Sequence, residues 1–475
     1  MAHRGGWVSN AMLAALLLLV LLGSLNDGAP LPLTSFFRMG SHRATEAEAA
    51  PAHAAAASEE AWSDSMLYSR SFASGLEGRH ARAAAGLGAH GHGRGYAFAT
   101  AGLQSLIRRT QFPTSCPGAR FLVSHGNGNA GGMGLGALLH VAAIHLGIAV
   151  SLGRTFVWHS DVLGQYADAE TCRELKGVNC FLRAPSSCTL EHALAAGADT
   201  VHVEQLGAGL QFGLNQEFVP PEALLLLSTQ GDTPDIPTEV ESVLTYMWRA
   251  QCTSFLMLLN DRTLSDLRIL RLLSMGGTEG RAAAPEAAVV ELLASMRIPP
   301  PLLQSFSPRI EGAPQSDFPL RGGTISVHIR HGDKWYEMAL VPTQKYLDAA
   351  VRLQHEMALG LVQQIFVSTE DPAALVELNN TLMSQPQSFA RWIVRYSELP
   401  RANSNGDNQL DVFSRLPRAR LTQLWLLQLL MALECDAWVG TRKSNWNRLI
   451  DELRCVWVPK CGLPFVEVGP PHLGW

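Results

Sequence analysis

The last third of the chain alternates between two spacings of apolar residues. Thr324 to Ile329 is a β-branched run that predicts a strand, and Thr343 to Leu359 places its apolar residues on one face of a helix. Both patterns then repeat: strands are expected within 364–371, 391–396 and 437–440, and helices over 417–434 and 444–453. Strands that alternate with helices predict parallel strands in a doubly wound sheet.

An earlier part of the chain shows a second unit of this kind. A strand pattern leads into a glycine-rich segment, a helical pattern and another strand, over 119–124, 126–136, 135–146 and 154–158. Gly132, Gly134 and Gly136 allow the backbone to approach a ligand closely, and the amides of a helix start favour an anion or a polar sugar. This order predicts a βαβ unit with a ligand-binding first turn.

The two units predict an α/β fold with two Rossmann-like domains that face a cleft. We expect the first domain over 116–320 and the second over 321–475. A segment rich in Gly, Ala and Pro, 276–312, is expected to cross from one domain to the other and includes a helix around Pro285 to Met296.

The residues before the first domain predict a membrane anchor and a flexible stem. Ala11 to Leu22 is an unbroken apolar block after a basic start, so we expect an uncleaved signal anchor over 1–25, with a cleaved signal peptide as the alternative. Residues 26–115 are dominated by Ala, Gly, His, Arg and Ser, which cannot bury enough apolar surface to order a chain. Either reading places the protein in the secretory pathway.

Composition and cysteine usage fit a luminal globular protein. The chain has 475 residues, of which 47% are hydrophobic and 17% charged, and its net charge of −5 gives no reason to expect nucleic acid as a partner. All eight cysteines follow the stem, and an even number in an oxidising compartment suggests disulfides. Cys455 and Cys461 flank a loop short enough to be bridged. Without a Cys-x-x-Cys pair, no structural zinc is expected.

Ionisable side chains gather where the strand that begins at Thr324 ends. In an open α/β sheet, ligands bind outside the carboxyl ends of the strands, so a ligand is expected at this place, and several cations suit a phosphate. The cluster comprises His328, Arg330, His331, Asp333 and Lys334, and the next strand ends in Thr369, Glu370 and Asp371.

A cleft between two such domains, an arginine directed at phosphate and the lack of a Walker lysine loop point to a sugar-nucleotide site. The sequence contains no Asp-x-Asp motif, which commonly holds a divalent ion on the diphosphate of such a donor. The charge of a departing diphosphate would then be stabilised by Arg330, Lys334 and helix amino termini, so no metal or other cofactor is expected. A simpler alternative is that Arg330 and Asp333 only form an ion pair at the strand end. His331 is expected to be structural.

The glycine-rich segment allows two rival interpretations. Gly126, Gly128 and Gly131 match the spacing of the dinucleotide fingerprint, with Asp161 as the ribose partner, which would make the protein a nicotinamide enzyme. The helical pattern starts later than that fingerprint demands, and Asp161 is about ten residues too distant. The second rival is a glycine-rich surface turn without a ligand.

Three motifs, in order, resemble those of the α1,6-fucosyltransferases that modify the core of N-glycans, within the wider fucosyltransferase superfamily. They are His328-Ile-Arg-His-Gly-Asp-Lys334, Val367-Ser-Thr-Glu-Asp-Pro372 and Asp436-Ala-Trp-Val-Gly-Thr-Arg-Lys-Ser444, and the segment 131–158 resembles the family's glycine-rich part. The resemblance implies a GT-B fold, a single-pass type II Golgi membrane protein with a luminal catalytic part, and inverting, metal-independent transfer of fucose from GDP-fucose to a glycan or glycoprotein acceptor.

The resemblance also implies roles for individual residues. Arg330 matches the arginine on the donor β-phosphate, and Glu337 lies one place from the family's catalytic base. The donor-binding matches are His328, Asp333, Lys334, Glu370, Asp371, Ser444 and Asn445. An inverting transfer needs a base for the acceptor hydroxyl and stabilisation of the leaving group on the opposite side.

Three departures from the family leave alternatives open. His331 stands where the animal enzymes have a second arginine, and Gln428 stands where they have an acid that reads guanine. Neither a coiled-coil stem nor a terminal SH3-like domain is recognisable in the sequence. The alternatives are the same scaffold with another nucleotide sugar, and a non-catalytic luminal protein that binds a glycan or a nucleotide.

Overall fold

The computed structural model describes thirteen stretches of the chain, some side chains within them excepted. They are 92–125, 134–159, 164–206, 218–228, 240–275, 320, 322–357, 363–389, 391–397, 417–441, 443–458, 460 and 463–469. Several predicted features lie outside the described residues. They are the anchor, the glycines of the dinucleotide-like spacing, Gly132, Asp161, the helix around 285–296 and the side chain of Asp333. Within the described stretches, no helix has the length and apolarity needed to cross a membrane.

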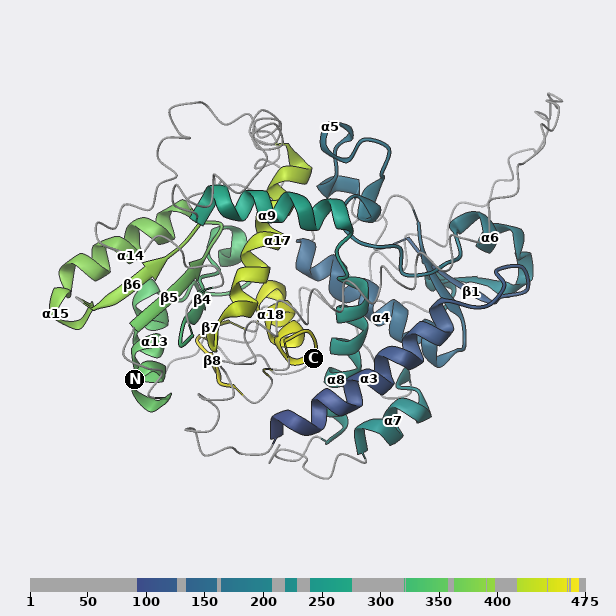
Figure 1. The fold of residues 1–475 in the computed structure, drawn as a ribbon, viewed down its shortest axis with the longest axis horizontal. Coiled ribbons are helices and arrows are strands. Elements are labelled where there is room, and N and C mark those ends of the chain that lie inside the picture. The colour runs from purple at the N-terminus through teal and green to yellow at the C-terminus, as the bar shows by residue number, and fades with distance from the viewer. Residues whose placement is uncertain are drawn as a thin grey trace, which may run out of the picture. The chain divides into compact units, whose positions relative to one another are not determined.

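The C-terminal half contains a five-stranded parallel sheet in the order β6-β5-β4-β7-β8, as the alternating pattern predicts (Figure 1). Ile325 on the central strand pairs with Ile365 on one side and with Ala437 on the other. The strands are β4 (Ile325–His328), β5 (Gln363–Ser368), β6 (Trp392–Arg395), β7 (Ala437–Gly440) and β8 (Phe465–Glu467). The sequence analysis did not anticipate β8.

Helices cover both faces of this sheet, which is why the strands are apolar almost throughout. Alternate residues of β4, such as Ile325 and Val327, join one core cluster with α13, whereas Phe366 and Trp438 face α17 and join another. The helices of this half are α13 (Thr343–Met357), α14 (Pro372–Ser384), α15 (Pro386–Phe389), α17 (Arg418–Glu434) and α18 (Asn445–Val456), with a 3-10 turn, η8 (Gly332–Tyr336). The expected doubly wound sheet is therefore present.

The N-terminal half contains a three-stranded parallel sheet in the order β2-β1-β3. Its strands are β1 (Phe121–Ser124), β2 (Thr155–Trp158) and β3 (Thr200–His202). Its long helices are α3 (His92–Gln111), α4 (Leu135–Ser151), α7 (Pro221–Ser228), α8 (Val240–Leu256) and α9 (Asp261–Met275). The shorter elements are η1 (Gly164–Tyr166), α5 (Ala169–Cys172), η2 (Gly177–Cys180), α6 (Leu190–Ala195), η3 (Gly197–Asp199) and η4 (Val203–Leu206).

Helix α3 corrects the expected stem. Residues 26–115 were expected to be flexible, yet the chain is helical from His92, and Leu103 and Ile107 are completely buried. These two residues lie four apart, on one face of the helix, and pack into the main core. The small apolar stripe is enough to order the helix because α7 and α8 pack against it.

Disulfides occur as the cysteine count predicts. Cys116 bonds to Cys188 and Cys172 bonds to Cys180, and Cys455 is also disulfide-bonded. Cys252 and Cys435 are buried free thiols. The two assigned bridges connect irregular segments around the small sheet. They stabilise the fold by restricting the conformations of the unfolded chain.

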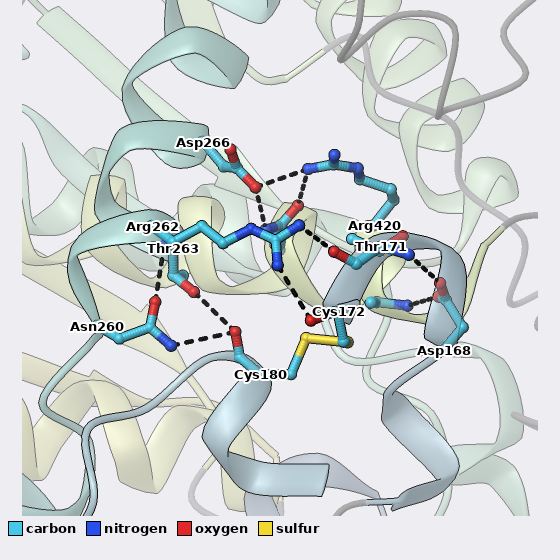
Figure 2. Close-up of polar contacts among 11 residues, drawn as sticks. Asp168, Thr171, Cys172, Cys180, Asn260, Arg262, Thr263, Asp266 and Arg420 are labelled. Atoms are coloured by element: carbon cyan, nitrogen blue, oxygen red, sulfur yellow. Dashed lines mark hydrogen bonds and ion pairs between the residues drawn. A yellow bond between two sulfur atoms is a disulfide. The ribbon is translucent and has the colours of Figure 1, made fainter. Parts of the chain in front are cut away.

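A polar network joins the Cys172–Cys180 region to the start of α17. Figure 2 shows the Arg262 guanidinium aimed at the carbonyl groups of Thr171 and Cys172, both of which accept hydrogen bonds from it. The Asp168 carboxylate accepts from Thr171 N at 2.7 Å and from Ala419 N at 2.7 Å, so it caps two helices at once. This network holds the first turn of α17 against the N-terminal half.

Candidate functional site

The strand order places a topological switch point beside β4. From β4 the chain proceeds to β5 and β6 on one side of the sheet and then returns to β7 and β8 on the other. Ligands of open α/β sheets bind outside the carboxyl ends of the strands where the order reverses, here β4 and β7. The residues that follow β4 and those that follow β7 belong to the first and third sequence motifs, so the topology brings these two motifs to one edge.

The turn after β4 is held by its own side chains. Gly332 has φ of +62°, a left-handed conformation that favours glycine, and it begins the 3-10 turn η8. His331 Nε2 lies 2.7 Å from the Val341 carbonyl oxygen, which can only accept, so this nitrogen donates. His331 Nδ1 lies 3.9 Å from an Asp371 carboxylate oxygen. His331 therefore fixes the turn, the structural role expected from the sequence.

His328 is a neutral residue of this site. Burial, with the nearby charge of Arg330, lowers the pKa of His328 to about 3. Its Nδ1 lies 2.9 Å from Ser368 Oγ, and its Nε2 is buried without a hydrogen-bond partner among the described residues. The imidazole thus links the ends of β4 and β5 and adds no positive charge at neutral pH.

Three cations from two elements gather at this edge. Arg330 is half-buried and donates from Nη1 to the His331 carbonyl oxygen at 2.7 Å. Burial lowers the pKa of Lys334; an ion pair with Glu337 opposes this effect, and the charges of Arg330 and Arg448 add to it. Burial also lowers the pKa of Arg448, on α18, to about 10. Lys334 thus lies within electrostatic reach of both Arg330 and Arg448.

Arg448 is a residue of this site that was not predicted from the sequence. It lies four residues after Ser444, where the third motif ends, and so one turn into α18. That spacing is the signal that could have found it, because residues one turn apart share a helix face.

Glu337 is a carboxylate beside these cations. Its carboxylate is ion-paired with Lys334, and its side chain is 66% exposed, so solvent or a ligand can reach it. Glu370, which is half-buried, lies just beyond β5. These positions leave Glu337 accessible beside buried cations.

Among the other matched polar residues, Asp371 and Asn445 form hydrogen bonds within the protein. Asp371 is buried and caps α14 by accepting from Ala373 N at 2.9 Å. Ser444 is the buried N-cap of α18 but makes no side-chain cap bond. Asn445 Oδ1 lies 3.1 Å from His140 Nδ1 and also accepts from Arg448. Asn445 thereby ties Arg448 to a helix of the other half.

The described end of the glycine-rich segment lies in the packing between two helices. Gly134 is the N-cap of α4. A Cβ added to Gly136 would lie 3.2 Å from backbone atoms of Asn445 and Trp446, at the start of α18. Gly136 therefore allows α4 and α18 to approach closely at the helix start that carries Arg448.

A buried ion network supports the same helix. Glu452 on α18 lies 2.9 Å from Arg249 Nε and 3.1 Å from His140 Nε2, and its side chain is completely buried. Burial alone would raise the pKa of Glu452, but the charges of His140 and Arg249 lower it to about 2. The network fixes α18, and with it Arg448, against α4 and α8.

The pH dependence of stability should report the buried histidines. Burial lowers the pKa of His328 to about 3 and that of His145, which lies 2.8 Å from Ser124 Oγ, to about 4. Between pH 6.5 and 4.5 the unfolded state binds protons that the folded state refuses, so stability falls as pH falls. Each histidine should cost about 1.4 kcal/mol per pH unit. Denaturant titrations across this range measure the slope.

Matched variants assign that slope to the two imidazoles. The double variant His328→Asn and His145→Asn should flatten the pH dependence, whereas His355→Asn, at an exposed position of α13, should leave it unchanged. An equal slope in the wild type and the double variant would contradict the neutral assignment.

Comparisons with known proteins return solved structures only. No protein-family model and no curated protein matches the chain. Fucosyltransferase NodZ from Bradyrhizobium is 13% identical, over 70% of this chain and 92% of NodZ, with a TM-score of 0.30. A mutant of Arabidopsis thaliana FUT1 in complex with GDP is 9% identical, over 75% and 73%, with a TM-score of 0.33. POFUT1 in its apo form is 10% identical, over 75% and 100%, with a TM-score of 0.32.

These neighbours are fucosyltransferases, but the superpositions are loose. At these identities and TM-scores the similarity shows no activity for this chain.

Proposed function

We propose that the protein is a glycosyltransferase that transfers fucose from GDP-fucose to a glycan or glycoprotein acceptor, with inversion and without a metal ion. The observation that carries the proposal is the gathering of Arg330, Lys334 and Arg448 at the switch point between β4 and β7. A cluster of buried and half-buried cations there suits a diphosphate. The three sequence motifs that resemble α1,6-fucosyltransferases end at the same sheet edge.

The cations would act on the leaving group. Breaking the bond between the sugar and the diphosphate leaves negative charge on the β-phosphate, and Arg330, whose guanidinium can form two parallel hydrogen bonds, would stabilise it. Lys334 and Arg448 would supply the further positive charge that a divalent ion supplies in other transferases. The turn after β4 holds Arg330 and Lys334, and the Glu452 network holds α18 with Arg448, so these groups are in position before the donor binds.

Glu337 is the proposed base. It would take the proton of the acceptor hydroxyl as the hydroxyl oxygen attacks the anomeric carbon from the face opposite the diphosphate. The exposed carboxylate beside Lys334 supports this role, since an acceptor can reach it while the buried cations hold the donor.

We further propose a Golgi membrane location, with an anchor over 1–25 and the catalytic part in the lumen. The disulfides Cys116–Cys188 and Cys172–Cys180 support an oxidising compartment. The apolar block Ala11 to Leu22 supports the anchor.

A donor panel on the full chain tests the function. Melting temperature and donor hydrolysis are measured with GDP-fucose, GDP-mannose, UDP-sugars and NAD. We expect GDP-fucose to raise the melting temperature and to be hydrolysed, because a ligand at a hundred times its Kd stabilises the native state by about 2.7 kcal/mol.

The other outcomes decide between the alternatives. A response to UDP-sugars would keep the scaffold and change the donor, which the buried Gln428 on α17 allows. Stabilisation by a GDP-sugar without hydrolysis of any donor would indicate a non-catalytic binding protein. A response to NAD alone would make the glycine-rich segment a dinucleotide site.

A further inference from the structure

Three histidines lie at the carboxyl ends of the three strands of the N-terminal sheet. His125 follows β1, His159 follows β2, and His202 ends β3. Because the strands are parallel and in register, these ends meet at one edge. The His125 ring lies 4.6 Å from that of His159 and 5.2 Å from that of His202, centroid to centroid, and its plane is inclined by 21° to that of His202. None of these residues belongs to the proposed donor site.

Two of the rings direct nitrogen atoms toward each other, and a carboxylate lies beside them. His125 Nε2 and His202 Nδ1 are 3.0 Å apart. Glu204, an exposed residue of η4, brings a carboxylate oxygen within 4.8 Å of one ring nitrogen of each histidine. The His202 backbone N donates to Gln205 Oε1 at 2.9 Å, which fixes the turn that carries both His202 and Glu204.

We propose that His125, His202 and Glu204 bind a divalent transition metal of the Zn²⁺ class. Two imidazole nitrogens on a tetrahedral Zn²⁺, each about 2.0–2.1 Å from the metal, are roughly 3.3 Å apart. The observed 3.0 Å is close to this separation, so a small widening and a turn of the two rings would direct both nitrogens at one metal ion. The proton shared between the rings moves to a nitrogen that does not bind the metal, so both imidazoles coordinate in their neutral form.

The donor set indicates what kind of metal site this is. Two imidazoles and one carboxylate are the ligand set of sites that keep a fourth position open, whereas closed structural sites use four protein ligands. The fourth position would be taken by water or by an oxygen or nitrogen of a bound molecule. Its place at the carboxyl ends of parallel strands is where a ligand of this half is expected.

The test compares metal binding by matched variants of the full chain. After chelator treatment and dialysis, each protein is titrated with ZnCl₂ alone in a calorimeter, and its melting temperature is measured with and without Zn²⁺. The wild type should bind one equivalent more than His202→Ala, and Zn²⁺ should raise its melting temperature more. The comparison removes any contribution from the other histidines of the chain, including His80 and His90.

Two further variants guard against a folding artefact. Glu204→Gln changes only an exposed side chain, so it should fold normally and weaken Zn²⁺ binding by about tenfold or more. His355→Ala removes an exposed imidazole from α13 and should bind as the wild type does. Equal Zn²⁺ stoichiometry and equal thermal shifts in the wild type, His202→Ala and Glu204→Gln would overturn the proposal, whatever the donor panel shows.

Discussion

Arg330→Ala is expected to lower turnover of GDP-fucose by about 10²–10³-fold while the protein stays folded. Arg330 is the cation that follows β4 at the switch point, and in the proposed reaction it holds the β-phosphate as negative charge develops. Its side chain is only half-buried, so the fold should tolerate its loss. Initial rates of donor hydrolysis and transfer measure the effect, and circular dichroism checks the fold.

Two control variants separate charge from geometry. Arg330→Lys keeps the positive charge but loses the planar fork, so it should recover only part of the activity. Arg352→Ala removes an exposed arginine from α13 and should leave turnover unchanged. Wild-type turnover by a folded Arg330→Ala protein would show that the donor phosphate is bound elsewhere.

Glu452→Ala is expected to lower the free energy of unfolding by about 3–5 kcal/mol. The substitution leaves Arg249 and His140 buried in the interface of α4, α8 and α18 without their shared carboxylate. The uncompensated Arg249 charge, more than the lost attraction, causes the cost. Chemical denaturation followed by circular dichroism measures it.

An exposed ion pair of similar length provides the control. Arg109 and Glu222 are 2.7 Å apart, but their side chains are 65% and 67% exposed, against 6% and 0% for Arg249 and Glu452. Glu222→Ala should therefore change stability by about 0–1 kcal/mol. Equal losses in the two variants would mean that burial does not determine the strength of the α18 network.

The sequence could predict most of the C-terminal sheet and the location of its site. The strand and helix patterns there depend on side-chain spacing within each segment, which is local information. The short strand β8 was missed, and α3 was taken for flexible stem because Ala and Gly around Leu103 and Ile107 concealed its narrow apolar stripe. That stripe orders a helix only because other helices pack on it.

The order of strands and motifs along the chain is enough to predict which side chains follow the parallel strands. It therefore predicts that Arg330 and Lys334 lie at the same sheet edge as the start of α18. The role of each side chain at that edge depends on packing, which only the folded chain provides. His328 is neutral because the fold buries it, and Asp371 caps a helix. Gly136 packs against α18, more than 300 residues away in sequence, so only folding could bring Arg448 into the site.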